Sequence, residues 1–384
     1  MICKQAQYPA IPVDRILGAP YGAVLRRDLS GAWERKRRGT EMADDEKPEV
    51  QENNQHLSQD NSAQSLTPDE VRDLKRSCDG EAVVEALASN SATFASKTKF
   101  AQEKYLKKKA QKHVQQVTLL RPTVMELCET YYRQSRAKVC GLRYDYLSSL
   151  LCHADVRSGA RFLVLDNAAG LVTGAMATQL GGVGQIFRVF RGGCPEKGLL
   201  ELDLSEAEKA AVRPVALEAL HATDLSTCEW LRATQGDEVP SDPAVASRQE
   251  ARLARVRQRR ESVEALKAQP VDGLVIVAGD DDAELAAEVV EVGLANLAPS
   301  GRVAMFGHHL QPLAALQGTW RNSGSFVDVR LEQLFTREYQ VLPARTHPHM
   351  VAEAQLCEGY ILSASKVAEG DGGQEPALKR QRTA

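Results

Sequence analysis

The chain has 384 residues, 43% of them hydrophobic, which is enough material for one large or two ordinary domains. Its formal net charge of −3 gives no reason to expect nucleic-acid binding from the chain as a whole, although acidic and basic segments are unevenly placed. The eight cysteines form no CxxC pair, which argues against zinc ribbons and redox motifs. We therefore expect reduced thiols in a cytosolic or nuclear protein. No apolar run reaches membrane-spanning length, so we expect no membrane partner.

The N-terminal part of the chain changes character twice. Residues 1–40 have the turn residues and aliphatic side chains of a small β region, with too little apolar material for a closed barrel. Residues 41–66 are acidic and polar and cannot bury enough surface to offset chain entropy, so we expect an acidic, disordered linker. Order resumes at Thr67, where Pro68 and Glu70 predict the capping box of a helix.

A lysine-rich segment follows these first helices, with one glutamate among seven lysines. The lysines are Lys97, Lys99, Lys104, Lys107, Lys108, Lys109 and Lys112. The segment is consistent with a solvated surface helix. It is equally consistent with a patch that follows a nucleic-acid backbone, because clustered lysines release its counterions. Phe100 and Tyr105 among the lysines fit RNA slightly better than a generic charged face.

Further elements complete a helical connector over residues 67–158, which includes this basic segment. Residues 117–120 are expected to be extended, and a helix is expected to open at Pro122. Another helix should begin near Gly141 and lead into the first strand of a sheet.

Residues 161–182 predict the opening strand and helix of a nucleotide-binding sheet. An apolar run that ends in Asp166 indicates a buried parallel strand, and a turn of small residues follows it. An amphipathic helix should then end at Gly181, and residues 185–190 should form the next strand. In such sheets the ligand lies at the N-terminus of this helix.

The same stretch lacks the residues that bind S-adenosylmethionine (SAM) or a dinucleotide. The turn over residues 166–170 has one glycine where two or three are expected. The second strand ends at Arg191, where an acid should bind the ribose hydroxyls. After the strand at 271–277 there is no Asx-Pro-Pro motif and no aromatic residue to hold a target base. Together these failures predict a degenerate cofactor site with no catalytic, cofactor-binding or metal-binding residues.

Residues 193–268 interrupt the sheet, and their polar and charged composition indicates an insertion. Helical pieces are expected, including one over residues 204–220, and residues 248–267 predict a polar helix with six arginines between Arg248 and Arg260. A helix this polar indicates a solvent-exposed, charged insertion and not a binding site.

The second half of the sheet follows this insertion. Strands are expected at residues 271–277, 302–306, 327–331 and 360–362. Asp280, Asp281 and Asp282 are interpreted as acids at a helix N-terminus, which are commoner than metal sites. The α/β domain therefore extends over residues 159–365, and residues 366–384 form a disordered tail whose basic end is a weak nuclear-import signal.

Several motifs resemble the non-catalytic subunit of the tRNA adenine-N1 methyltransferase, the partner of a SAM-binding subunit that methylates a T-loop adenosine at position 58. They lie at residues 91–94, 98–105, 120–123, 141–145, 169–172 and 337–348. The last of them, REYQVLPARTHP, is long and unusual. The resemblance covers roughly residues 90–365.

This resemblance implies a Rossmann-like class I methyltransferase fold with a degenerate SAM site, preceded by a β-barrel domain of which residues 1–40 would be a truncated remnant. It also implies a heterotetramer of two catalytic and two non-catalytic subunits, with tRNA held across both kinds and SAM bound by the partner. We accordingly expect no cofactor, no enzymatic activity of this chain by itself, and a nuclear location.

The resemblance also adds residues to the expected tRNA-binding set. Besides the lysines, these are Arg121, Arg143, Arg337, Arg345 and His347, near the RNA or the partner interface. The arginines could equally be buried structural residues. Two other functions remain open: an active SAM-dependent RNA methyltransferase with an atypical cofactor turn, and a scaffold that binds a protein partner and no RNA.

Overall fold

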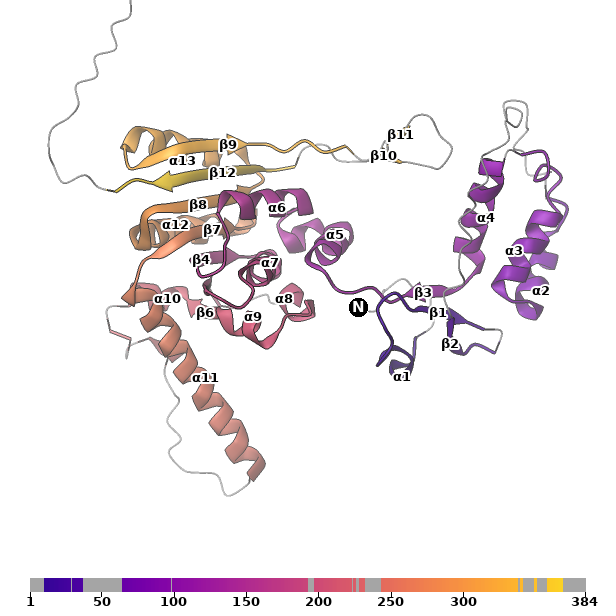
Figure 1. The fold of residues 1–384 in the computed structure, drawn as a ribbon, viewed down its shortest axis with the longest axis horizontal. Coiled ribbons are helices and arrows are strands. Elements are labelled where there is room, and N and C mark those ends of the chain that lie inside the picture. The colour runs from indigo at the N-terminus through magenta and orange to yellow at the C-terminus, as the bar shows by residue number, and fades with distance from the viewer. Residues whose placement is uncertain are drawn as a thin grey trace, which may run out of the picture. The chain divides into compact units, whose positions relative to one another are not determined.

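The computed structural model describes residues 10–28, 30–36, 64–97, 99–192, 197–222, 224–225, 228–231, 243–337, 339–340, 349–350 and 358–368. The chain divides into two compact units, both drawn in Figure 1. The smaller unit comprises residues 1–121 and 338–352, and the larger unit comprises residues 122–337 and 353–384.

The larger unit is built on a mixed seven-stranded sheet with the order β6-β5-β4-β7-β8-β12-β9 (Figure 1). Its strands are β4 (Arg161–Asp166), β5 (Gln185–Phe190), β6 (Val212–Ala216), β7 (Val271–Val277), β8 (Leu297–Gly307), β9 (Phe326–Glu332) and β12 (Tyr360–Lys366). The first five in sheet order are parallel, and β12 is antiparallel to both β8 and β9. This is the strand order of the Rossmann-like class I methyltransferase fold, which confirms the predicted fold class.

Helices cover both faces of this sheet. One layer contains α5 (Val124–Gln134), α6 (Tyr144–His153), α7 (Leu171–Leu180), α8 (Lys197–Glu201) and α9 (Glu206–Ala211). The other contains α10 (Leu217–His221), α11 (Pro243–Ala268), α12 (Ala283–Asn296) and α13 (Leu310–Ser323), and short 3-10 turns lie at Arg136–Val139, Glu229–Leu231 and Asp280–Asp282. Side chains alternate along β4, so Phe162 and Val164 enter one core while Leu163 and Leu165 enter the other.

Strand β6 corrects the helical prediction for residues 204–220. This stretch forms α9, β6 and α10 in succession. A short apolar run does not distinguish a strand from a helix by its periodicity, and Pro214 disfavours the centre of a sheet. Because β6 is the edge strand with a neighbour on one side only, it tolerates Pro214, which lacks the backbone N–H that an inner strand needs for pairing on both sides.

Helix α11 is only partly the exposed insertion that its composition predicted. Near its C-terminal end, Val263 and Leu266 are fully buried in the second core, although Leu253 in its N-terminal half is 45% exposed. This end of α11 is therefore part of the helical layer beside the sheet. The polar composition of the whole helix hides its short apolar end.

The smaller unit combines an antiparallel three-stranded sheet with helices. The sheet has the order β2-β1-β3, and Leu25 and Trp33 are buried in it. Its strands are β1 (Val24–Arg27), β2 (Trp33–Lys36) and β3 (Gln116–Thr118), and a separate pair joins β10 (Tyr339–Gln340) to β11 (His349–Met350). The helices are α1 (Val13–Ile16), α2 (Pro68–Ser77), α3 (Gly80–Ser89) and α4 (Lys99–His113).

Local sequence signals explain how these helices begin. The predicted capping box at α2 is confirmed: Thr67 Oγ1 accepts a hydrogen bond from the Glu70 backbone at 3.3 Å, and a Glu70 carboxylate oxygen accepts one from the Thr67 backbone at 2.8 Å. The described cysteines form no disulfide. No described helix is both long and apolar enough to cross a membrane.

Candidate functional site

The turn after β4 is held by the carboxylate of Asp166. The buried Asp166 carboxylate accepts hydrogen bonds from the Ala168 backbone at 3.0 Å and from the backbone and the hydroxyl of Thr173, both at 2.8 Å. Thr173 lies in the first turn of α7, where backbone N–H groups have no acceptor within the helix. Asp166 supplies the acceptor for the Thr173 backbone. This acid thus performs a structural task within the chain.

The short helix α8 packs directly on the same turn. The Gly198 backbone donates a hydrogen bond to the Ala169 carbonyl at 2.8 Å, and the Tyr131 hydroxyl of α5 donates one to Glu201 at 2.5 Å. A Cβ at Gly198 would lie 3.0 Å from both the Ala169 carbonyl oxygen and the side chain of Leu171. Protein atoms therefore fill space beside the N-terminus of α7, where a cofactor lies in this class of sheet.

Cations lie at the end of β5 where the ribose-binding acid is expected. Arg188 is 1% exposed, and its guanidinium donates a hydrogen bond to the Asp166 carbonyl at 3.2 Å. Arg191 forms an ion pair with Glu288 of α12, which His221 also contacts at 2.8 Å. The sequence already shows Arg191 at the position where a ribose-binding acid is expected. It does not show that Arg188 is buried, because an arginine within an apolar strand can also lie exposed at the edge of a sheet.

The end of β7 contacts this turn through side chains. The Asn167 amide donates a hydrogen bond to the Asp282 carboxylate at 2.7 Å, and its backbone donates one to the Val277 carbonyl at 3.0 Å. Asp282 is the N-cap residue of α12, but its side chain makes no capping hydrogen bond. The aspartates therefore lie at the N-terminus of α12 as predicted, and the Asp282 carboxylate accepts from Asn167 instead of from the helix backbone. The described residues contain no cluster that could hold a metal ion.

The predicted lysine patch lies on α4 of the smaller unit and in the segment just before it. Lys104, Lys107, Lys108 and Lys112 are exposed, whereas Lys97 and Lys109 are half-buried; the side chain of Lys99 lies outside the described residues. Within the described part of the chain, none of the other six lysines forms a salt bridge. The helix therefore presents uncompensated positive charge, as a phosphate-binding surface requires.

Tyr105 organises two of these lysines but does not present its ring as an open stacking platform. Its hydroxyl donates a hydrogen bond to the Leu87 carbonyl of α3 at 3.2 Å, and its ring packs on Phe94 with the centroids 5.4 Å apart. The ammonium groups of Lys97 and Lys109 lie 4.9 and 5.3 Å from the ring centroid. Tyr105 thus joins α4 to α3 and positions lysines, which differs from the base-stacking role that its sequence context suggested.

The pKa of His113, at the end of α4, is lowered by its surroundings. Burial, followed by the charges of Lys75, Lys109 and Lys112, lowers its pKa to about 4. An unfolded histidine titrates near pH 6.5, so between about pH 6.5 and 4 the unfolded chain binds more protons than the folded chain. Stability must therefore fall as the pH falls through this window.

We expect His113→Gln to remove part of this acid sensitivity. On lowering the pH from 7.5 to 5, the wild-type chain should lose about 1 kcal/mol more stability than the variant, after allowance for solvent screening. Urea unfolding of both chains at the two pH values measures the difference. An equal loss in both would show that His113 does not carry the effect.

The remaining predicted tRNA-binding residues are not gathered at one place within either unit. Arg143 is 9% exposed and binds Asp145 through two hydrogen bonds of 2.9 and 2.6 Å, which is a structural role within the larger unit. Arg121 is exposed in the smaller unit, and Arg337 is exposed with its guanidinium 5.4 Å from the Phe335 ring centroid. Arg345 and His347 lie outside the described residues. A role for these residues in tRNA binding remains a prediction.

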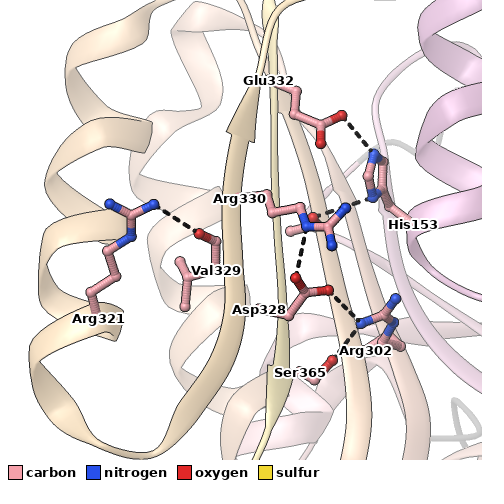
Figure 2. A network of polar contacts seen from close by, with 9 residues as sticks. His153, Arg302, Arg321, Asp328, Val329, Arg330, Glu332 and Ser365 are labelled. Atoms are coloured by element: carbon pink, nitrogen blue, oxygen red, sulfur yellow. Dashed lines mark hydrogen bonds and ion pairs between the residues drawn. The ribbon is translucent and has the colours of Figure 1, made fainter.

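A polar network at the outer edge of the sheet was not predicted. Figure 2 shows His153 of α6 beside Glu332 of β9, with 3.0 Å between the ring Nε2 and the carboxylate. Arg302 and Arg330 both contact Asp328, at 3.5 and 2.7 Å (Figure 2). The contacts of His153 and Arg302 fasten β9, the edge strand, to α6 and β8, whereas Arg330 binds Asp328 within β9 itself. Because His153 and Arg302 lie far from their partners in sequence, no local pattern indicates these two contacts.

Comparisons with known proteins place the chain among relatives of one kind. A sequence model described as the Gcd10p family matches residues 6–257. The tRNA (adenine(58)-N(1))-methyltransferase non-catalytic subunit TRM6 of Mus musculus is 28% identical over 424 residues, which cover 96% of this chain and 84% of that protein. The subunit of the same name from Dictyostelium discoideum is 28% identical and covers 82% of this chain and 64% of its own length. That of Schizosaccharomyces pombe is 25% identical, with 87% and 81% covered.

Solved structures resemble the chain more distantly. The tRNA (m1A58) methyltransferase TrmI from Aquifex aeolicus is 12% identical, with a TM-score of 0.39, and covers 67% of this chain and 80% of its own. A SAM-dependent O-methyltransferase from Thermotoga maritima is 15% identical, with a TM-score of 0.38 and coverage of 68% and 77%.

Proposed function

Because the chain belongs to the Gcd10p family, we propose that it is the tRNA-binding, non-catalytic subunit of a tRNA (adenine-58-N1)-methyltransferase complex. The observation that carries this proposal is the turn at the N-terminus of α7, whose backbone groups at Thr173 and Ala169 are hydrogen-bonded within the chain. As a non-catalytic subunit, the chain requires a catalytic methyltransferase partner, and that partner would bind SAM and form the methylated adenosine.

Three finer statements belong to the same proposal. The lysines of α4 would contact tRNA phosphates, because their charges lack carboxylate partners among the described residues. The complex would contain two subunits of each kind, with tRNA held across both. The chain would act in the nucleus, which the basic run at residues 379–382 supports.

Replacing Lys107, Lys108 and Lys109 with alanine tests the tRNA-binding role. In the complex with the catalytic partner, we expect tRNA affinity at low salt to fall roughly tenfold and the slope of log affinity against log salt to flatten by about two to three. Fluorescence anisotropy with labelled tRNA at several salt concentrations measures both quantities. An unchanged slope would refute the assignment of these lysines to phosphates.

Lys138→Ala, in the larger unit, is the matched control for the loss of an exposed charge. It should leave the salt slope within experimental error of the wild-type value. SAM binding by the complex should be unaffected in both variants, which separates a loss of tRNA affinity from a failure of the subunits to assemble.

A further inference from the structure

A second cationic feature of the smaller unit lies around the end of α4 and shares only Lys112 with the exposed lysines of that helix. A polar cleft of about 340 Å³ opens between β1, the turn after it, the end of α2, the start of α3 and the end of α4. Its lining includes Arg27, Lys75, Lys112 and His113. Three cations, Arg27, Lys75 and Lys112, thus approach one hollow from three separate elements. His113, whose pKa is lowered to about 4, is neutral at pH 7.

Close packing of two helix ends builds this cleft. A Cβ at Gly80, the first residue of α3, would lie 2.6 Å from the His113 carbonyl oxygen and 2.8 Å from the Cα of Val114. Only a glycine lets the two backbones approach this closely. The start of α3 therefore brings the end of α4, with Lys112 and His113, to the wall of the cleft.

Arg27 is a fixed cation without a carboxylate partner among the described residues. Its Nε donates a hydrogen bond to the Gly31 carbonyl at 3.1 Å, and its Nη1 donates one to the Gln115 side chain at 3.2 Å. Both acceptors are neutral, so they orient the guanidinium without cancelling its charge. A guanidinium held in this way is preorganised for the two-pronged contact that arginine makes with phosphate.

The other cations of the cleft are also uncompensated within the described part of the chain. Lys75 and Lys112 are exposed and form no salt bridge there. The ring nitrogen Nδ1 of His113 is shielded from solvent and makes no hydrogen bond. Burial is the main cause of the lowered pKa of His113, and the nearby charges of Lys75, Lys109 and Lys112 lower it further.

The acids that line the cleft are already engaged by the protein. Glu81 forms a salt bridge of 2.5 Å with Arg26. Asp79 caps α3 by accepting a hydrogen bond from the Ala82 backbone at 2.8 Å, and Asp28 accepts from Ser30 at 2.7 Å and from the Ala32 backbone at 2.8 Å. The charge of Glu81 is therefore balanced by Arg26, whereas Asp28 and Asp79 keep their charge with their oxygens held by donors of local turns. Arg27, Lys75 and Lys112 have no carboxylate partner among the described residues.

We infer that this cleft binds a backbone phosphodiester of tRNA through Arg27, Lys75 and Lys112. The inference rests on the proposed tRNA-binding function and adds to it a specific phosphate position. The exposed lysines of α4 follow the backbone as a diffuse charge, whereas the cleft fixes one phosphate between a rigid guanidinium and two ammonium groups. A fixed phosphate sets where the RNA lies on the subunit, which diffuse charge does not.

The test compares three variants of the full chain in complex with its catalytic partner. Lys75→Gln with Lys112→Gln removes two charges from the cleft, and both side chains are exposed, so the fold is preserved. Arg72→Gln with Arg133→Gln removes two charges whose partners are Asp69 and Glu129 and serves as the matched control. The variant at Lys107, Lys108 and Lys109 reports the proposed function by itself.

We expect the cleft variant to weaken tRNA binding roughly three- to tenfold at low salt and to flatten the salt slope by about two, with the control unchanged. Lys75 and Lys112 should also be protected by tRNA from acetylation in the wild-type complex, as measured by mass spectrometry. A cleft variant that binds like the control, with both lysines acetylated equally with and without tRNA, would overturn the inference.

The outcomes separate this inference from the proposed function. If the variant at Lys107, Lys108 and Lys109 is impaired and the cleft variant is not, the cleft assignment fails and the tRNA-binding role stands. If the wild-type complex binds no tRNA, both fail together. Arg27→Gln provides an independent check. This variant should flatten the salt slope by about one if the cleft binds a phosphate, and it should leave the slope unchanged if the cleft is not used.

Discussion

Replacing Asp166 with alanine should lower the free energy of unfolding of the larger unit by about 3 kcal/mol. The substitution removes the acceptor of three hydrogen bonds and leaves two backbone donors, at Ala168 and Thr173, buried without a partner. Each stranded donor costs about 1–3 kcal/mol, so the loss exceeds that of the side-chain volume alone. A residue that would contact a cofactor only when one is bound should cost far less.

Urea unfolding followed by circular dichroism measures this effect. Asp166→Asn keeps the shape and one acceptor oxygen, so it should cost about half as much. Asp281→Ala is the control, because Asp281 is exposed and lies just before α12. If Asp166→Ala and Asp281→Ala gave equal stabilities, the structural role of Asp166 would be refuted.

The purified chain should give no heat of binding when SAM is titrated into it, whereas the complex with its catalytic partner should bind about one SAM per heterodimer. The physical reason is competition for the same space and the same groups. The Ala169 carbonyl is bound by Gly198, and the end of β5 carries Arg191 in an ion pair with Glu288. A cofactor would have to break these contacts without a ribose-binding acid in return.

Isothermal titration calorimetry of the chain, alone and co-purified with the catalytic subunit, measures the stoichiometry. The co-purified sample controls for the activity of the SAM preparation. Saturable binding to the isolated chain would instead identify an active methyltransferase with an atypical cofactor turn and would overturn the proposed function.

The central strands could be predicted from the sequence almost to the residue. The bounds of β4, β5 and β7 agree with the predicted ranges, because strands buried on both faces are continuous apolar runs that end sharply at polar residues. Strand β6 could not be predicted in this way. It has one neighbour and contains Pro214, so its pattern is short and is compatible with the helices that flank it.

The candidate site could be predicted in composition but not in geometry. The missing glycines and the cation at Arg191 are visible in the sequence, since they depart from a known spacing. The contact between Gly198 and Ala169 joins distant segments, and no local pattern indicates it. The direction of Tyr105 is equally hidden, because a tyrosine among lysines can face either RNA or a neighbouring helix. The sequence also gave no sign that Arg143 is buried and hydrogen-bonded to Asp145.

The contacts around the turn after β4 make the loss of its original chemistry hard to reverse during evolution. An acid introduced at Arg191 would face the carboxylate of Glu288, and a glycine introduced at Ala168 would loosen the turn that Asp166 holds. Each single step toward a working cofactor site would therefore weaken the fold before it restored any binding. Selection on such a chain is expected to retain the division of labour between two gene products, because every path back to self-sufficiency passes through less stable intermediates.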